Sequence, residues 1–252
     1  MAVIADTDSV YSVVVAAIFN QDNMNITCTY AFEKEIEYYK KTLELDPKNG
    51  LYMRRLGIAL LKQKKIKKAV IYLKDSLNKV VNPYRTYKYL ASANEMLKNY
   101  PEAIRYYKLA LNLQPQDNLD WYRYGISLYM QKDYTNSIVA FNKALTYSDQ
   151  EDHKFQALIK RRLAKVYIRL KSFNNAILNL QESLELNNKY LLARLDFASL
   201  LFKLKGRNKE GEHELSLVLK LEPDNCKALK LANKNGLTKY QKSWSQKCIE
   251  QK

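Results

Sequence analysis

Few side chains in this 252-residue sequence have the types and spacing that catalysis needs. The cysteines, Cys28, Cys226 and Cys248, are odd in number and show no C-x2-C spacing, so we expect reduced thiols and neither a zinc site nor a disulfide framework. The histidines, His153 and His213, lie far apart among charged residues, as solvated surface histidines do. The sequence has no nucleophile elbow, glycine-rich phosphate loop or paired-carboxylate arrangement. It therefore predicts a protein that is not an enzyme and that needs no metal or cofactor.

Charge is the next feature that bears on function. The chain carries 42 Lys and Arg against 26 Asp and Glu, a net charge of +16. The first 33 residues hold no base and four acids, so residues 34–252 carry a balance of +20. A basic surface of this kind can steer and select an acidic partner. We expect that partner to be another protein or a peptide, with a nucleic acid as the alternative.

The elements that must position any binding residue repeat every 34 residues, counted from residues 50, 84 and 118. Small residues share one column: Ala69, Ala103 and Ser137. Large residues share the next column: Leu73, Tyr107 and Phe141. Within each repeat, apolar residues recur at three- and four-residue steps in two successive segments, which indicates one helix followed by another. Each repeat is therefore predicted to be a helical hairpin.

In these columns the chain resembles the tetratricopeptide repeat family, whose pattern begins W-x2-L-G-x2-Y and continues A…F…A…P. The clearest second half is Ala103-x3-Tyr107-x2-Ala110-x4-Pro115, and the clearest first half is Trp121-x2-Tyr124-Gly125-x2-Leu128. Small residues let two helices approach closely, large ones fill the gap beyond them, and proline ends the second helix. The resemblance implies an all-α fold, a right-handed solenoid of tandem hairpins whose first helices line a concave groove.

The register divides the chain into segments. About five hairpin repeats are predicted, over residues 50–83, 84–117, 118–151, 157–190 and 191–224. The register slips after Glu151, so we expect residues 152–156 to form a loop. Residues 31–49 match only the second helix of a degenerate repeat, and the turn of the fifth repeat is one residue longer than the others. Residues 225–252 are predicted to form a capping helix or helices.

The free face of each first helix remains after the packing columns are assigned, and the resemblance implies that this face lines the groove. The predicted partner-binding residues are Arg54, Ile58, Arg85, Lys88, Tyr122, Ile126, Tyr129, Arg161 and Lys165. The aromatic and apolar residues of the third repeat lie between two basic stretches. This pattern predicts a protein-interaction scaffold or adaptor that binds an extended peptide, either acidic or with hydrophobic anchors. Solvated charges and core aromatic residues are the alternative interpretation.

Two narrower functions are compatible with parts of this pattern. One branch of the family grips a C-terminal carboxylate with Lys and Asn side chains, but Lys88 is followed by Ser92 where that branch has Asn, so the match is partial. RNA binding in a basic groove is the other, because lysines cluster between Lys62 and Lys68. That cluster falls at a predicted turn and not on the inner face, so a solvated rim is the alternative.

The two ends of the chain depart from the repeats. Residues 1–30 include a largely apolar run from Val10 to Phe19, which is too short to span a bilayer and has acids where a secretory signal needs bases. We therefore expect no transmembrane segment, no signal peptide and a cytoplasmic location. This acidic extension either caps the first hairpin or lies in the protein's own basic groove and blocks it.

At the carboxyl end, an amphipathic helix should follow Gly236, with Leu237, Tyr240 and Trp244 on one face. We predict that this helix packs on the last hairpin as a terminal cap. Alternatively, Trp244 contacts a second copy of the chain or another partner, since aromatic residues are enriched in interfaces. The sequence leaves the oligomeric state open.

Overall fold

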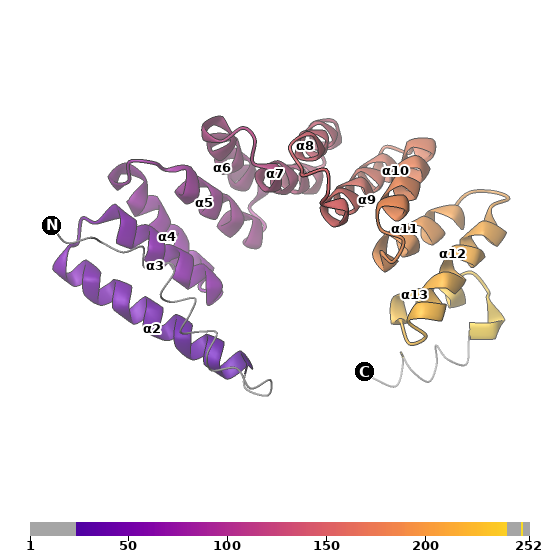
Figure 1. Ribbon diagram of the computed structural model, residues 1–252, viewed down its shortest axis with the longest axis horizontal. Helices are drawn as coiled ribbons and strands as arrows, with labels where there is room; N and C mark the ends of the chain where they lie inside the picture. Colours follow the sequence, from indigo (N-terminus) through magenta and orange to yellow (C-terminus); the bar gives the residue numbers. More distant parts are fainter. Residues whose placement is uncertain (1–23, 241–247, 249–252) are drawn as a thin grey trace. The chain divides into compact units, whose positions relative to one another are not determined.

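The structure is a computed structural model that describes residues 24–240 and Cys248. All regular secondary structure in these described residues is helical. The chain forms two compact units, Met1–Ala110 and Leu111–Lys252, which we call unit 1 and unit 2. In the described part of each unit, consecutive helices pair in hairpins, so the predicted all-α solenoid class is confirmed (Figure 1).

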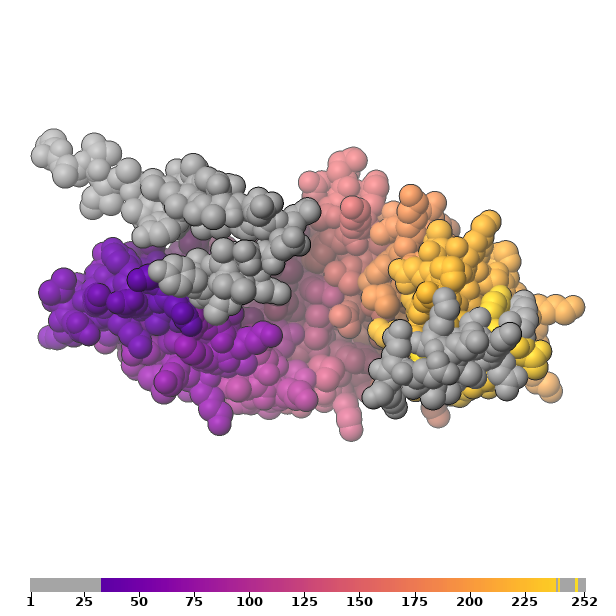
Figure 2. Space-filling model, turned by 90° about the horizontal axis from the view of Figure 1, so that it is seen from below, coloured from indigo at the N-terminus to yellow at the C-terminus, as the bar shows by residue number. Residues whose placement is uncertain are grey.

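Unit 1 consists of one long helix followed by helical hairpins. Its helices are α2 (Met24–Leu45), α3 (Gly50–Lys62), α4 (Ile66–Ser76), α5 (Tyr84–Met96) and α6 (Tyr100–Leu113), with a 3-10 turn at Leu77–Lys79. Helix α6 crosses the boundary into unit 2. Helix α2 packs against α3 (Figure 1), and in Figure 2 the indigo and violet atoms of this part of the chain form one continuous surface. The ring centroids of Tyr39 on α2 and Tyr52 on α3 lie 6.3 Å apart. The segment boundary predicted at residue 30 falls inside α2.

Unit 2 continues the hairpins and ends in a short helix. Its helices are α7 (Asn118–Met130), α8 (Tyr134–Thr146), α9 (His153–Arg169), α10 (Phe173–Leu186), α11 (Leu191–Leu201), α12 (Asn208–Leu221) and α13 (Cys226–Lys234), with a 3-10 turn at Thr238–Tyr240. The loop predicted for residues 152–156 is wrong, because residues 153–156 form the first turn of α9. Asp152 caps that turn by accepting a hydrogen bond from the amide of Phe155, and the Phe155 ring packs edge-on at 5.5 Å from Tyr122.

Polar residues explain where several other helices begin. The side chains of Asn49, Asp117, Asp133 and Asn225 accept hydrogen bonds from first-turn amides of α3, α7, α8 and α13. Such caps satisfy amide groups that no helical carbonyl can reach. These residues therefore set the start of each helix and, with it, the faces that the helix presents.

The tight hairpin turns share one backbone conformation. Each turn has three residues, and the central one is a lysine with φ between 57° and 67°: Lys64, Lys98, Lys132 and Lys171. The amide that follows the lysine bonds back to a carbonyl five residues earlier, as from Asp133 to Leu128 at 3.0 Å. This is a helix end of the Schellman type, which glycine usually completes, because a left-handed backbone costs other residues roughly 1–2 kcal/mol.

Small residues let the paired helices approach closely. The small column predicted from the sequence, Ala69, Ala103 and Ser137, is fully buried. Gly125 of α7 lies against the ring of Phe141 of α8, where an added Cβ would be 2.8 Å from Cε1. The hydroxyl of Ser137 donates a 2.8 Å hydrogen bond to the carbonyl of Gly125 across the same crossing. The columns of the register thus mark the places where helices cross.

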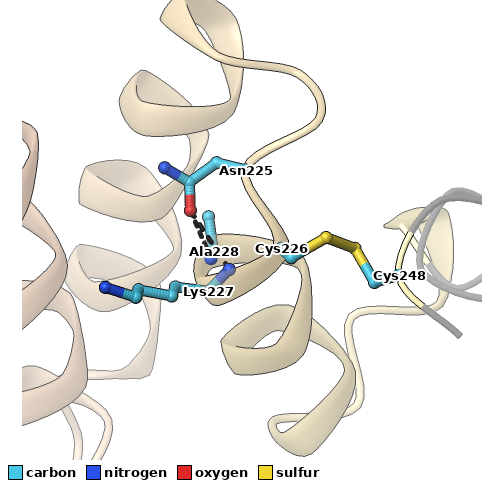
Figure 3. The surroundings of a disulfide bond; sticks show 5 residues. All are labelled: Asn225, Cys226, Lys227, Ala228 and Cys248. Carbon is cyan, nitrogen blue, oxygen red and sulfur yellow. Dashed lines mark hydrogen bonds between the residues drawn. A yellow bond between two sulfur atoms is a disulfide. The ribbon is translucent and has the colours of Figure 1, made fainter. Parts of the chain in front are cut away.

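A disulfide bond holds the carboxyl end of unit 2. Cys226, the first residue of α13, is bonded to Cys248, and their Cα atoms are 5.6 Å apart (Figure 3). The expectation of reduced thiols is therefore wrong for these two cysteines. A separation of 22 positions gave no sign of the bond, because disulfide formation depends on Cα atoms that approach in space and not on a sequence pattern.

Leu237 and Tyr240 pack against the core cluster of α11, α12 and α13, so the described part of the carboxyl end covers the last hairpin. Trp244 lies outside the described residues, as do residues 1–23. The predictions made for both remain predictions. None of the described helices has the length and apolar character that crossing a bilayer requires.

Candidate protein-binding surface

In unit 1 the predicted groove residues bring cations close together. These residues are Arg54 and Ile58 on α3, and Arg85 and Lys88 on α5. The guanidinium of Arg54 donates to the carbonyl oxygen of Asn82 at 3.2 Å. Burial lowers the pKa of Arg54, and the positive charges of Arg85 and Arg55 lower it further. An anion bound beside Arg54 would relieve this repulsion, since an opposite charge favours the charged form of the guanidinium.

In unit 2 the predicted residues are Tyr122, Ile126 and Tyr129 on α7, and Arg161 and Lys165 on α9. Arg161 is only 8% exposed. Its Nε donates to the Asp196 carboxylate at 2.7 Å, and its Nη1 donates to the hydroxyl of Tyr190 at 3.3 Å. The ammonium of Lys165 lies 3.8 Å from the same carboxylate. Arg161 therefore holds α9 to α11, and it is not presented to a ligand.

The two tyrosines act through their hydroxyl groups. The Tyr122 side chain is buried, with its ring centroid 5.9 Å from that of Phe141, and its hydroxyl accepts a hydrogen bond from Nε of Arg162 at 3.1 Å. The hydroxyl of Tyr129 accepts a hydrogen bond of the same length from Nε of Arg169, and this bond raises the pKa of Arg169. Each tyrosine thus orients an arginine that the sequence analysis did not select for the groove.

A pocket lies beside these arginines. Its lining residues are Ile126, Tyr129, Met130, Phe141, Arg162 and Lys165, and we call it the α7–α9 pocket. The lining combines apolar side chains with two cations and contains no acid. Within the described part of the chain, no carboxylate pairs with Arg162 or Arg169. The pocket is suited to an apolar side chain that has an acidic neighbour.

The sequence analysis selected Arg161 where the structure uses Arg162, and the reason is geometric. Repeat-equivalent positions on α7 and α9 are 39 residues apart, whereas each tyrosine contacts an arginine 40 residues later. One residue turns an α-helix by about 100°, so Arg161 faces α11 while Arg162 faces α7. The sequence did contain a signal for these contacts. Tyr122 and Tyr129 are seven residues apart and so lie on one face of α7, and Arg162 and Arg169 lie in the same way on one face of α9.

The lining of the α7–α9 pocket combines two cations and the hydroxyl of Tyr129 with apolar side chains. Its lining holds no carboxylate, histidine or thiol that could transfer a proton or act as a nucleophile. Among all described residues, no group of three or more His, Cys, Asp or Glu side chains could hold a metal ion. Cations, tyrosine hydroxyls and apolar surface remain, and they suit recognition of a peptide.

Helical hairpins in tandem, with small residues where the helices cross, define an α-solenoid repeat protein. Models of one family, the tetratricopeptide repeat, match residues 99–153 and residues 162–190. These two segments are tetratricopeptide repeats, and the family predicted from the 34-residue register is confirmed for them.

Solved structures share this fold at low identity. YrrB, described as a TPR protein with an unusual peptide-binding site, has a TM-score of 0.62 at 13% identity over 79% of this chain and 99% of its own. PilF of Pseudomonas aeruginosa has a TM-score of 0.62 at 18% identity, over 87% of this chain and 91% of its own. A crystal structure of MamA has a TM-score of 0.59 at 20% identity, over 68% of this chain and 98% of its own. Identities this low establish the fold alone. No curated protein matches the chain.

Proposed function

We propose that this protein is a non-enzymatic scaffold for protein–protein interaction that binds an acidic, extended peptide at the α7–α9 pocket. The proposal rests on two arginines, Arg162 and Arg169, which tyrosine hydroxyls orient beside an apolar pocket. The repeat family supports binding of proteins or peptides, as does the peptide-binding site named for YrrB. Arg54, Arg85 and Lys88 form a second, acid-binding patch in unit 1.

The spacing of the two arginines restricts the ligand. They are two helical turns apart on α9, which corresponds to about 10.5 Å along the helix axis. A polyproline II peptide advances about 3.1 Å per residue and returns to the same side every third residue, so acids at positions i and i+3 are about 9 Å apart. Such a peptide brings one acid to each arginine, and an apolar side chain between the acids enters the pocket. The preferred ligand is therefore acid-x-x-acid with an apolar residue inside the motif.

A displayed random-peptide library, selected on the full chain, tests this motif. We expect the enriched peptides to carry two acids three positions apart around an apolar residue. The double substitution Arg162→Glu and Arg169→Glu should lower the affinity for an enriched peptide by at least about 100-fold, because each charged hydrogen bond contributes about 1.5–3 kcal/mol. Arg161 is left unchanged in this variant, because its replacement would leave the Asp196 carboxylate without its partner.

The matched control replaces Lys220 and Lys230 by Glu, which reverses the charge of two exposed side chains on α12 and α13. This variant has the same change in net charge and should bind the enriched peptide as the unaltered chain does. Enrichment of peptides that lack acids, or an equal loss of affinity in the control, would contradict the proposal.

A further inference from the structure

The lysines in the hairpin turns are not explained by the fold. Lys64, Lys98, Lys132 and Lys171 are all exposed, and none of them forms an ion pair in the described part of the chain. Each adopts the left-handed backbone that glycine tolerates best. The fifth turn does place a glycine there, Gly206 with φ of 83°. Four turns thus keep a lysine at a position where its backbone is strained and its side chain is exposed.

These turns lie at one edge of each unit, because the paired helices run antiparallel. In unit 2 the residues between first and second helices are 131–133, 170–172 and 202–207. They carry five bases and one acid: Lys132, Lys171, Lys203, Lys205, Arg207 and Asp133. The carboxylate of Asp133 caps α8, and the guanidinium of Arg207 is paired with the Glu210 carboxylate, so the four lysines carry the positive charge of this surface. We call this surface the turn edge.

The loops between successive hairpins have the opposite charge. In unit 2 they comprise residues 114–117, 147–152, 187–190 and 222–225. They carry six acids and one base: Asp117, Asp149, Glu151, Asp152, Glu222, Asp224 and Lys189. We call this the loop edge. Unit 2 is therefore polarised, with a basic turn edge and an acidic loop edge.

The turn edge also exposes aliphatic side chains. Met130 and Leu170 come just before the turn lysines of unit 2 and are 47% and 44% exposed. In unit 1, Met96 and Leu97 stand in the same place before Lys98 and are similarly exposed. The aromatic residue of the unit 2 turns, Phe202, packs against the carboxyl-terminal core cluster. Nucleic-acid surfaces use aromatic rings to stack on bases, whereas basic residues beside exposed aliphatic ones suit a lipid headgroup region.

We propose that the turn edge docks on the surface of an anionic lipid bilayer. The turn lysines contact lipid phosphates and carboxylates, and the methionine and leucine side chains enter the headgroup layer. The acidic loop edge of unit 2 is repelled by the same surface, which orients unit 2 on the bilayer. This inference does not rest on the peptide-binding proposal, because none of the turn lysines lines the α7–α9 pocket. Met130 belongs to both surfaces, so the tests of this inference change only lysines.

Sedimentation of the full chain with phosphatidylcholine vesicles, with and without phosphatidylserine, tests the inference. The unaltered chain should bind the vesicles that contain phosphatidylserine. Replacing Lys132 and Lys171 by Glu should weaken this binding by at least about 30-fold, since each lysine near an anionic surface contributes about 1 kcal/mol. The matched control replaces Lys154 and Lys189 of unit 2 by Glu; both are exposed at or next to the loop edge, and this variant should bind as before.

A second variant separates binding from folding. Replacing the same two turn lysines by glycine removes their charge but favours the left-handed turn. The thermal midpoint of this variant should not fall, while its vesicle binding should fall by about 30-fold. The inference is overturned if the unaltered chain does not prefer phosphatidylserine, or if the control set loses as much binding as the turn set. It is also overturned if the turn lysines are needed for binding a single-stranded RNA while the vesicles are not bound.

Discussion

The hydroxyl groups of Tyr122 and Tyr129 each accept a hydrogen bond from an arginine of the next hairpin. Their rings fill the space between helices, so each tyrosine serves packing and presentation together. A phenylalanine at either position would keep the packing of the ring, but it lacks the hydroxyl that accepts the hydrogen bond from the arginine. The value of these residues for binding can therefore be measured apart from their value for stability.

Replacing both tyrosines by phenylalanine should change the free energy of unfolding by no more than about 1.5 kcal/mol per lost hydrogen bond. The affinity for a library-selected peptide should fall by roughly 5-fold or more, because the freed arginines lose orientation on binding. Chemical denaturation and calorimetric titration measure the two quantities. Tyr147→Phe, outside the pocket lining, is the control, and an unaltered affinity in the double variant would disprove the orienting role.

Gly125 is the residue on which the α7–α8 crossing depends. Gly125→Ala should lower the free energy of unfolding by about 1–3 kcal/mol, because the new Cβ would lie within 3 Å of the Phe141 ring. Shortening that ring with Phe141→Leu should restore part of the loss. An equal cost of Gly125→Ala in the Leu background would show that the clash is not the cause. Urea titration of the single and double variants measures both effects.

At the scale of elements, the carboxyl end depends on a covalent link. The Cys226–Cys248 bond ties the segment after α13 to the start of that helix. Disulfides persist in oxidising compartments and are rare in the cytosol. The bond and the predicted cytoplasmic location therefore indicate different compartments. Thiol labelling of the protein taken directly from its cells would distinguish them.

Cys226→Ser should lower the free energy of unfolding by about 3 kcal/mol, because the bond closes a loop of roughly 22 residues in the unfolded chain. Under reducing conditions the unaltered protein should lose the same amount, and the variant should not respond to reductant. Thermal unfolding with and without dithiothreitol measures this difference. If the oxidised protein and the variant unfold at the same temperature, the bond does not stabilise the folded chain.

For the whole molecule, a net charge of +16 makes binding of either an acidic peptide or RNA conceivable. The number of ionic contacts that each ligand makes distinguishes the two, because it sets how steeply the affinity depends on salt. The proposed peptide contacts two arginines, so a plot of log affinity against log salt should have a slope of about two or less. A single strand of RNA releases about 0.7 counterion for each phosphate contacted, which gives a much steeper slope for a long footprint. Titration of the selected peptide and of an RNA oligonucleotide compares the two. Tight RNA binding with a steep slope would favour the nucleic-acid alternative.

The sequence predicted the helical hairpins, but only some of its predicted groove residues line the α7–α9 pocket. Ile126, Tyr129 and Lys165 line the pocket as one group, whereas Arg161 is buried in an ion pair. Met130 and Arg162 were missed as groove residues. A repeat register identifies equivalent positions, but a pocket is made by neighbouring positions. On α9 the repeat-equivalent position is Arg161 and the pocket-lining position is Arg162. One residue along the helix is enough to turn the Arg161 side chain away from the pocket.

By itself, the sequence determined that this chain is a stack of helical hairpins, because the 34-residue columns of small and large residues encode local contacts between paired helices. Only the tertiary structure decided which arginine lines the α7–α9 pocket and which cysteines are bonded. It also showed that lysines adopt a left-handed backbone in the turns. These features depend on the angle of a helix about its axis and on the approach of distant segments in space, and neither is periodic in the sequence.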